Sequence, residues 1–497
     1  MTQPSGEPFS RVSSGVSGLD DVLHGGLPEH RIYLIEGDPG TGKTTLAMQF
    51  MLRGLRDGGR GLYVTLSETE DELRIMADAH GWDISSLLIF ECVPVEANLS
   101  PDNQYTFFHP EEIELGETIQ TILTRVEEAQ PTHLVIDALT ELRLLAQDAR
   151  RYRRQVLALK HYFAKKKTTV FMLDDRTSLT QEKQLHSVVH GVLSLERIPR
   201  DYGRNRRRIE ITKVRGSSYL DGYHDYQIHR GGLTVYPRLL ASQHHTDFTR
   251  SMISCNVRNL DDLLGGGLDR GSASLFVGPP GSGKTTLAIK YATAAIDRGE
   301  PVSMYTFDEG LGTLFARSEG LGIPISRHMK EGKMELHQVD PAEMSPDEFA
   351  WSVRQSVERN GAKFVVIDSL NGYLNAMPEE QFLNLQMHEL LTYLNQRGVV
   401  TILVLAQQGP LGQHSTAVDL SYLADTIVLL RFFEFQGEIR RAISVIKKRA
   451  TTHEQSIREF RIGGTGGVEV GDPLTQFHGV LTGIPQFTGD LGHLFGE

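Results

Sequence analysis

Two segments of the chain combine glycine, lysine and threonine at a spacing that suits phosphate binding. The first is Gly-Asp-Pro-Gly-Thr-Gly-Lys-Thr at 37–44, and the second is Gly-Pro-Pro-Gly-Ser-Gly-Lys-Thr at 278–285. Both match the pattern G-x-x-x-x-G-K-[ST], in which glycines let backbone N–H groups converge on phosphate oxygens. The lysine reaches the β- and γ-phosphates, and the last hydroxyl is placed to bind Mg²⁺. The sequence therefore predicts two ATP-binding P-loops.

The P-loop pattern assigns two matching sets of ATP-binding residues. They are Gly37, Gly40, Thr41, Gly42, Lys43, Thr44 and Thr45 in the first loop, and Gly278, Gly281, Ser282, Gly283, Lys284, Thr285 and Thr286 in the second. The alternative is a glycine-rich turn with an accidental lysine. Repetition argues against it, because Lys284 follows Lys43 by 241 residues and the upstream segment 18–27 recurs at 259–268. The chain is predicted to contain two copies of one nucleotide-binding domain.

Carboxylates follow the second predicted strand of each half. Glu68 comes after the strand at 61–66, and Asp308 with Glu309 comes after the strand at 302–307. Ligands of a parallel α/β sheet lie beyond the carboxyl ends of its strands. We therefore expect these three residues to be catalytic and to orient water on bound ATP. The alternative for Glu68 is a charge at a helix N-terminus, but Glu309 recurs at the same 241-residue spacing, which favours a catalytic role.

Two aspartates end apolar strands, as the Walker B aspartate of P-loop proteins does. Asp137 ends the segment 133–137, and Asp368 ends the segment 364–368. Such an aspartate binds Mg²⁺ through water, beside the hydroxyl of the P-loop. The predicted metal-binding residues are therefore Thr44 and Asp137 in the first half, and Thr285 and Asp368 in the second.

The segments around these residues predict the fold. An apolar run enters each P-loop, at 32–35 and at 273–277, and a helical pattern leaves it. Strand and helix patterns then alternate along the chain. We expect an α/β fold of two tandem P-loop domains, each a mainly parallel twisted sheet flanked by helices. The predicted divisions are a disordered lead-in at 1–15, domains at 16–240 and 253–485, a linker at 241–252 and a tail at 486–497.

Composition limits the classes of function. The 497 residues carry a formal net charge of −12, which argues against indiscriminate nucleic-acid binding. The two cysteines leave no zinc cluster and no disulfide framework. No apolar run is long enough to span a bilayer, and the N-terminus lacks a signal-peptide core. We expect a cytoplasmic protein with no membrane partner, and nucleic acid is a disfavoured partner.

Two polar clusters leave alternatives open. The first consists of Arg150, Arg151, Arg153 and Arg154 at the start of a predicted helix. We expect it to form a solvated or inter-subunit face, and direct nucleic-acid contact is the alternative. The second cluster is the pair His244 and His245 in the predicted linker. This pair could bind a metal ion, but a flexible tether is the favoured interpretation.

The motifs together resemble the KaiC family of double-domain, RecA-like ATPases and autokinases of bacterial clocks. Each half has a P-loop, a G-G-L lead-in, a carboxylate after the second strand and a late K-x-R, and the likeness continues at 425–430, 437–438, 441–443 and 457–460. The resemblance implies RecA-like domains in a two-tiered homo-hexamer, with ATP between neighbouring subunits. The further ATP-binding residues that it implies are Lys213, Arg215, Arg441, Lys447 and Arg449.

The two K-x-R motifs have a specific expected role under this resemblance. Lys213 and Arg215, with Lys447 and Arg449 in the second tier, would reach the nucleotide of the neighbouring subunit. A cation supplied by a neighbour stabilises the charge of the transition state, and a head-to-tail contact closes into a ring when its rotation permits. The alternative is surface charge on an edge strand.

The chain departs from the family pattern at three positions. The family carries paired glutamates after the second strand, and the leading one is replaced by Ser67 in the first half and by Asp308 in the second. Aspartate keeps the carboxylate but reaches one methylene less far. The family's adjacent Ser-Thr phosphorylation site corresponds to Ser421 and Tyr422. Modification of Ser421 alone is therefore expected, and the alternative is that Ser421 merely precedes a strand.

Three functions are compatible with these residues. The favoured one is a Mg²⁺-dependent ATPase with Ser421 autokinase activity, acting as a hexameric signalling or clock-type switch with ATP and Mg²⁺ as cofactors. The second is a nucleotide-gated scaffold that hydrolyses ATP slowly and presents its ring to a KaiB-like protein or a signalling kinase. The third is a DNA motor of the RecA or DnaB kind, which the acidic charge and the absence of a basic tail disfavour.

Overall fold

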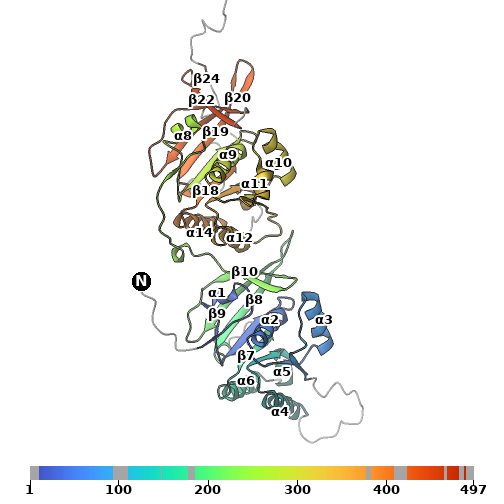
Figure 1. The fold of residues 1–497 in the computed structure, drawn as a ribbon. Helices are drawn as coiled ribbons and strands as arrows, with labels where there is room; N and C mark the ends of the chain where they lie inside the picture. The colour runs from blue at the N-terminus through green and yellow to red at the C-terminus, as the bar shows by residue number, and fades with distance from the viewer. Residues whose placement is uncertain are drawn as a thin grey trace, which may run out of the picture. The chain divides into compact units, whose positions relative to one another are not determined.

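The computed structural model describes residues 10–92, 110–146, 148–176, 185–375, 382–407, 422–463, 467–480 and 486–487. The chain divides into two compact units, residues 1–238 and 239–497, which we call the first and second units. Each unit is built on a nine-stranded sheet with helices on both faces (Figure 1). The predicted α/β fold of two tandem domains is confirmed.

The sheet of the first unit has the order β11-β10-β9-β8-β3-β7-β6-β4-β5. Pairing is parallel from β8 to β5 and antiparallel from β8 to β11. The strands are β3 (Ile32–Gly37), β4 (Gly61–Thr65), β5 (Leu88–Glu91), β6 (His133–Asp137), β7 (Thr169–Asp175), β8 (Gly191–Ile198), β9 (Arg206–Val214), β10 (Tyr223–His229) and β11 (Gly232–Tyr236). We call the end of the sheet where the parallel strands finish its P-loop end, and the end where they start its far end.

Helices cover both faces of this sheet because its central strand is apolar on both sides. They are α2 (Lys43–Arg56) and α3 (Glu70–His80) on one face, and α4 (Pro110–Ala129), α5 (Leu139–Ala146) and α6 (Ala149–Phe163) on the other. Tyr33 and Ile35 of β3 are buried in the first layer, and Ile32 and Leu34 are buried in the second. Successive strand side chains point to opposite faces, so an apolar strand needs cover on both.

The second unit repeats this plan in the order β16-β15-β17-β18-β14-β19-β20-β21-β22. Pairing is parallel from β16 to β19 and antiparallel from β19 to β22. The strands are β14 (Ala273–Gly278), β15 (Val302–Thr306), β16 (Met334–Gln338), β17 (Phe364–Asp368), β18 (Val400–Ala406), β19 (Thr426–Phe435), β20 (Glu438–Lys448), β21 (Arg458–Ile462) and β22 (Val468–Pro473). One face is covered by α9 (Lys284–Asp297), α10 (Leu311–Gly320) and α11 (Ile325–Lys330), and the other by α12 (Pro346–Glu358), α13 (Leu370–Asn375) and α14 (Leu383–Gln396).

The disordered lead-in predicted at 1–15 is too long. Residues 11 and 12 form β1 (Arg11–Val12), which pairs with β2 (Leu27–Pro28). The Ser13 hydroxyl donates a hydrogen bond to the Asp20 carboxylate of α1 (Leu19–Val22) at 2.5 Å. Both contacts join the segment to residues further along the chain, which the local polar composition did not indicate.

The linker predicted at 241–252 is bound along the second unit and is not a free tether. The short elements here are η2 (Ala241–Gln243), β12 (Met252–Ile253), α8 (Arg258–Leu263) and β13 (Leu268–Asp269), and β12 pairs with β13. Between η2 and β12, the ring of Phe248 lies against Gly271 and Gly398. A Cβ added at these glycines would come within 2.3 Å and 2.6 Å of the ring. Only residues without side chains leave room for the ring, and a composition argument could not see this contact.

The tail predicted at 486–497 begins inside a paired strand. Residues 486 and 487 form β24 (Gln486–Phe487), which pairs with β23 (Phe477–His478). The rings of Phe477 and Phe487 lie 5.5 Å apart, centroid to centroid, and each also contacts Phe435 of β19. Aromatic packing therefore extends the second unit into the predicted tail.

Candidate functional site

The first P-loop connects β3 to α2 at the P-loop end of its sheet. Gly42 lies at the N-cap of α2 with φ 94°, a left-handed conformation that favours glycine. Lys43 Nζ donates to the carbonyl oxygens of Gly37 at 2.8 Å and Asp38 at 3.2 Å. The first turn of α2 holds no acidic residue, so its backbone N–H groups and positive dipole end are suited to an anion.

The second P-loop has the same local structure. Gly283 caps α9 with φ 101°, and Lys284 Nζ donates to the carbonyl oxygens of Gly278 at 2.9 Å and Pro279 at 2.8 Å. Burial lowers the pKa of Lys284, and the nearby carboxylate of Asp368 opposes this shift. The remaining predicted P-loop residues lie in these two loops or in the first turn of the helix that follows each: Gly40, Thr41, Thr45, Gly281, Ser282 and Thr286.

Among the described residues, a carboxylate forms an ion pair with the P-loop lysine of the first unit but not with that of the second. Asp175 Oδ1 lies 2.6 Å from Lys43 Nζ, because Asp175 pairs with Gly37 at the ends of the adjacent strands β7 and β3. In the second unit the residue paired with Gly278 is Ala406. The two P-loops therefore differ in charge at the position where phosphate must meet lysine.

The predicted metal-binding residues come together in both units. The Thr44 hydroxyl donates to Asp137 Oδ2 at 3.1 Å, and the Thr285 hydroxyl donates to Asp368 Oδ2 at 2.6 Å. Burial raises the pKa of both aspartates, that of Asp368 to about 6. A hydroxyl beside a buried carboxylate is an oxygen donor set that fits Mg²⁺, and a cation there would favour the charged carboxylate. In the first unit Tyr63 also donates to Asp137, at 2.6 Å.

Glu68 lies beside the first P-loop and outside the helix that follows it. The N-cap of α3 is Thr69, and the acidic residues of its first turn are Glu70, Asp71 and Glu72. Those residues account for the charge at the helix N-terminus, so Glu68 is not needed for it. Partial desolvation, followed by the charges of Asp137 and Glu72, raises the pKa of Glu68. A raised pKa makes this carboxylate a better proton acceptor.

Both predicted carboxylates of the second unit have partners. Asp308 Oδ2 accepts a hydrogen bond from the hydroxyl of Ser369, the residue after the Walker B aspartate. Glu309 Oε2 lies 2.8 Å from Arg317 Nη2 of α10. In the first unit the position of Asp308 is occupied by Ser67, and Ala138 follows the Walker B aspartate. Both members of the Asp308–Ser369 pair are therefore replaced in the first unit, by Ser67 and Ala138.

The K-x-R residues lie at the opposite end of each sheet from the P-loop of the same unit. Strand β9 is antiparallel to β8, and its last residue, Val214, pairs with Gly191 at the start of β8. Lys213 and Arg215 are therefore at the far end of the first sheet. Since β3 has six residues, the P-loop lies roughly 20 Å away along the strand direction. These cations cannot reach their own P-loop.

Cations gather at this far end of the first unit. Burial and the charges of Arg215 and Lys160 lower the pKa of Lys213 to about 8. Burial and the charges of Arg31, Lys160, Arg215 and Lys213 lower the pKa of His190 to about 4. Mutual repulsion of this kind is relieved by a bound anion, so the cluster is suited to receive one.

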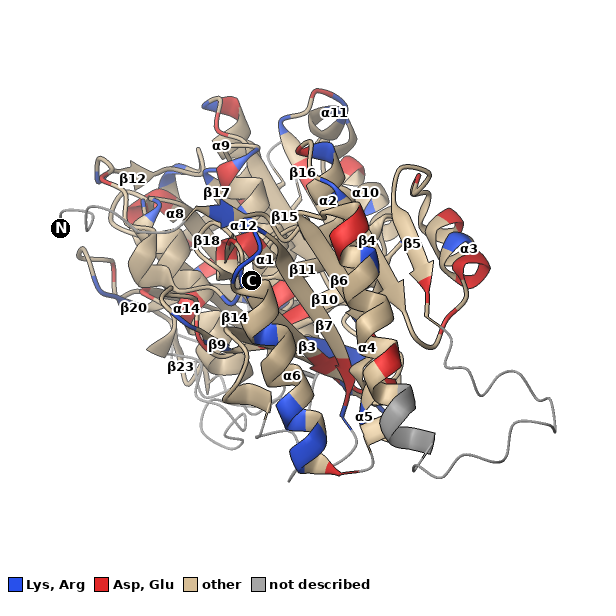
Figure 2. Cartoon of the chain, turned by 90° about the horizontal axis from the view of Figure 1, so that it is seen from below, with Lys and Arg blue, Asp and Glu red and all other residues tan. Residues whose placement is uncertain are grey.

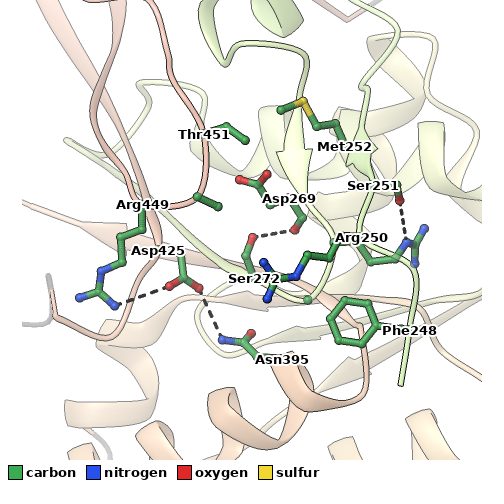
Figure 3. A pocket seen from close by; sticks show the side chains of 13 residues that line it. Phe248, Arg250, Ser251, Met252, Asp269, Ser272, Asn395, Asp425, Arg449 and Thr451 are labelled. Atoms are coloured by element: carbon green, nitrogen blue, oxygen red, sulfur yellow. Dashed lines mark hydrogen bonds and ion pairs between the residues drawn. The ribbon is translucent and has the colours of Figure 1, made fainter. Parts of the chain in front are cut away.

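The far end of the second unit is hollowed into a pocket of about 470 Å³ beside Arg449 (Figure 3). Arg449 Nη1 lies 3.6 Å from Asp425 Oδ1, and the ring of Phe248 and the guanidinium of Arg250 also line the pocket. Lys447 Nζ donates to the carbonyl oxygen of Ala424 at 2.9 Å. This pocket is the second-unit counterpart of the cationic far end of the first unit.

Arg441 is placed differently from the K-x-R cations. It pairs with Phe432 near the start of β20, and its Nε donates to the carbonyl oxygen of Gly281 at 3.3 Å. Arg441 therefore lies against the P-loop of its own unit. The expected phosphorylation residue, Ser421, lies outside the described residues.

The comparison with protein families identifies the fold family. A family model described as "ATPase: KaiC" matches twice, at residues 12–239 and 253–475. The chain belongs to the KaiC family. Each of its two P-loop units corresponds to one match of the KaiC model. Membership in this family of ATPases implies nucleotide use with a divalent metal ion.

Individual KaiC proteins match the chain over almost their full length. The circadian clock oscillator protein KaiC of Picosynechococcus sp. is 27% identical over 96% of this chain and 92% of its own. The circadian clock protein KaiC3 of Synechocystis sp. is 27% identical over 98% of this chain and 97% of its own. The circadian clock oscillator protein KaiC of Thermostichus vulcanus is 26% identical over 97% of this chain and 93% of its own.

Several further predictions concern the surface of this KaiC-family chain. Arg150, Arg153 and Arg154 are exposed on α6, whose blue bands in Figure 2 mark its cationic face. His244 packs edge-on against the ring of Tyr393, and the described residues contain no group of three or more His, Cys, Asp or Glu side chains arranged to hold a metal ion. No helix within the described ranges is long and apolar enough to cross a membrane.

Sequence reasoning missed four residues of the KaiC-type sites. They are Tyr63, Asp175, Arg317 and Ser369. The acidic end of the strand that contains Asp175 was visible, but its contact with Lys43 depends on strand order. The hydroxyl of Ser369 directly follows the Walker B aspartate, which was the one local indication available for it.

Proposed function

We propose that this KaiC-family chain is a Mg²⁺-dependent ATPase whose sites are completed by an adjoining copy of the chain in a homo-hexameric ring. The observation that carries the proposal is the separation of each P-loop from the K-x-R cations of its own unit. Each far end has cations and no P-loop, and the phosphates of ATP bound at a P-loop end would attract a further cation. A head-to-tail contact joins the two and closes into a ring.

The proposed reaction is in-line attack of water on the γ-phosphorus of ATP. Lys43 and Lys284 hold the phosphates, and Glu68 in the first unit orients the water and accepts its proton. Mg²⁺ would be held by a hydroxyl and a carboxylate in each unit: Thr44 with Asp137 in the first, and Thr285 with Asp368 in the second. The bound ion would neutralise charge on the phosphates. Lys213 with Arg215, and Lys447 with Arg449, of the adjoining copy stabilise the charge that develops in the transition state.

A mixing experiment tests completion of the site by a second copy. Both chains carry Glu309→Gln to silence the second unit. One also carries Lys43→Ala, and the other Arg215→Ala. Each is expected to hydrolyse ATP poorly alone, whereas random mixing restores an intact P-loop facing an intact Arg215 at about a quarter of the contacts.

The control for this experiment pairs two defects on the same side of the contact. A Glu68→Gln chain mixed with the Lys43→Ala chain contains no contact with both Lys43 and Glu68 intact, so no recovery is expected. Absence of recovery in the Arg215→Ala mixture would reject completion by an adjoining copy. Absence of hydrolysis by the unmodified chain would reject the ATPase itself.

Autophosphorylation of Ser421 is a second candidate activity. The backbone carbonyl oxygen of its described neighbour Tyr422 accepts a hydrogen bond from Arg449 Nη2 at 3.4 Å, at the far end that would meet the ATP of the adjoining copy. Transfer would move the γ-phosphoryl group to the Ser421 hydroxyl and release ADP and a proton. Intact mass after incubation with Mg-ATP is expected to rise by one phosphate in the native chain and to stay unchanged in Ser421→Ala.

A nucleotide-gated scaffold is the alternative to a self-contained switch. The loss of a leading carboxylate at Ser67 supports slow hydrolysis in the first unit. A KaiB-like protein or a signalling kinase is the proposed partner, and its capture should differ between ADP and an ATP analogue. A DNA motor would instead show ATP turnover stimulated by nucleic acid and falling steeply with salt.

A further inference from the structure

The second unit contains an arginine in contact with a carboxylate expected to act on water. Arg317 lies on α10, two turns after Glu309, and its Nη2 is 2.8 Å from Glu309 Oε2. The side chains are 37% and 22% exposed, so solvent screens the pair only in part. Burial raises the pKa of the Walker B residue Asp368, and the charge of Arg317 opposes this shift.

No such contact is present among the described residues of the first unit. The N-cap of α10 is Gly310, and the N-cap of the corresponding helix α3 is Thr69. Seven residues after the N-cap, the second unit has Arg317 and the first unit has Met76. The nearest arginine on α3, Arg74, pairs instead with Glu70 of the same helix. Among the described residues, the Glu68 side chain forms no hydrogen bond and no ion pair.

The contact changes what Glu309 can do. A carboxylate orients water through an oxygen lone pair, and the guanidinium of Arg317, bound at 2.8 Å, occupies one oxygen of Glu309. With that oxygen bound to Arg317, Glu309 has less freedom to turn toward a water molecule at the γ-phosphate. Asp308, the other carboxylate of the second unit, is itself bound to the Ser369 hydroxyl.

We propose that Arg317 is a positioning residue that restrains Glu309 and slows ATP hydrolysis in the second unit. The inference rests on the proposed ATPase function and adds a regulator to one of its two sites. The second unit is then expected to hydrolyse its ATP more slowly than it would without this contact.

The test measures steady-state ATP turnover in the full chain with Glu68→Gln, which silences the first unit. Adding Arg317→Met is expected to raise kcat about three- to tenfold, because the freed Glu309 oxygen can then accept a hydrogen bond from the attacking water. The KM for ATP is expected to change less than kcat, since Lys284 and its loop still grip the phosphates. A kcat that is unchanged or lower would overturn the proposal.

A double substitution separates restraint of Glu309 from a general structural effect. In a Glu68→Gln, Glu309→Gln chain, Arg317→Met has no carboxylate to release, so no rise in turnover is expected. A rise of the same size there would overturn the proposal. Arg327→Met is the matched control, because Arg327 forms an exposed pair with Glu331 on α11, and turnover should stay unchanged.

The converse substitution keeps the proposal testable if Arg317→Met fails to fold. Met76→Arg places a guanidinium at the matching position of α3, in a chain whose second unit is silenced by Glu309→Gln. Turnover by the first unit is expected to fall about three- to tenfold, and no fall would count against the proposal. If the Glu309→Gln chain binds and hydrolyses no ATP at all, the ATPase proposal fails instead.

Discussion

At the scale of single residues, the two nucleotide sites differ in their charges although their P-loops match. Lys43 faces Asp175, whereas Lys284 faces no carboxylate at the matching position, Ala406. Glu309 is held by Arg317, whereas the Glu68 side chain has no ion pair within the part of the chain that the structure describes. These differences predict that the two units bind and use ATP at different rates.

Asp175→Ala is expected to tighten ATP binding to the first unit. Phosphates must displace the Asp175 carboxylate from Lys43, and a partly exposed ion pair of this kind is worth about 1 kcal/mol, or about a fivefold change in affinity. The measurement is the dissociation constant of an ATP analogue in a Lys284→Ala chain, where only the first unit binds. Weaker binding would show that Asp175 helps to hold Lys43 in its working position.

Ala406→Asp is the matched test in the other unit. It introduces the carboxylate at the register position that Asp175 occupies, next to Gly278. In a Lys43→Ala chain it is expected to weaken binding of the ATP analogue by a similar factor. The two substitutions together separate the effect of this one charge from other differences between the units.

At the scale of elements, a tight turn at Gly18 brings the lead-in of the first unit against its sheet. Gly18 has φ 78° at the N-cap of α1, and a Cβ there would lie 2.0 Å from the carbonyl oxygen of Val235 in β11. Gly58 has a similar φ of 81° after α2, but a Cβ there would meet nothing within 4 Å. Comparing substitutions at Gly18 and Gly58 therefore separates the cost of backbone strain from the cost of steric overlap.

Gly18→Ala is therefore expected to destabilise the first unit more than Gly58→Ala. Strain at a positive φ costs on the order of 1 kcal/mol in both variants. Overlap with a strand carbonyl adds at least that amount again for Gly18 only. The midpoint of urea unfolding, followed by circular dichroism, measures the difference, and equal midpoints would contradict the steric account.

The far end of the first sheet makes stability depend on pH. His190 Nδ1 accepts a hydrogen bond from the backbone N–H of Ile32 at 3.2 Å, and burial with neighbouring cations lowers the pKa of His190 to about 4. The unfolded chain takes up this proton near pH 6.5, before the folded chain does. The stability that His190 contributes is therefore full above about pH 6.5 and lost as the pH falls toward 4.

His190→Asn is expected to remove part of this dependence. Asparagine keeps an acceptor for the Ile32 N–H and does not titrate. After allowance for partial exposure, the effect is on the order of 1 kcal/mol between pH 7 and pH 5. Urea midpoints at both pH values, without nucleotide, measure it. An equal loss in the variant and the native chain would mean that other groups cause the dependence.

At the scale of the whole molecule, the segment between the two P-loop units belongs to the second unit. Leu239 and Ala241 are buried in its core, and Phe248 lies against Gly271 and Gly398. The same segment lines the pocket beside the Arg449 end of β20. The anchoring of this segment is therefore expected to keep the start of the second unit ordered and to shape the far end that would meet an adjoining copy.

Phe248→Ala is expected to loosen this segment locally. Loss of the ring contact frees the residues around Arg250, an exposed site for trypsin. Cleavage after Arg250 should accelerate about tenfold, since a local opening that costs about 1.4 kcal/mol less is ten times more populated. Asp247→Ala is the control, because its side chain is fully exposed and should leave the rate unchanged. Equal rates in the two variants would mean that Phe248 does not anchor the segment.

The chemistry of the two P-loops was largely predictable from sequence, because each motif is local. Phosphate binding needs glycines, a lysine and a hydroxyl within eight residues, and strand and helix patterns on either side establish their setting. The repeat at 241 residues then determined the two-domain α/β fold. The proximity of Asp137 and Asp368 to the P-loop threonines was also predictable, and their role in binding Mg²⁺ stays a prediction.

Contacts between strands were decided only by the tertiary structure. Sequence spacing does not reveal that β7 lies beside β3, which brings Asp175 to Lys43, or that helix α10 turns Arg317 toward Glu309. It also could not separate Arg441, which lies at its own P-loop, from Arg449 at the other end of the same strand. Local motifs determine which groups are present, whereas strand order and direction determine which groups meet.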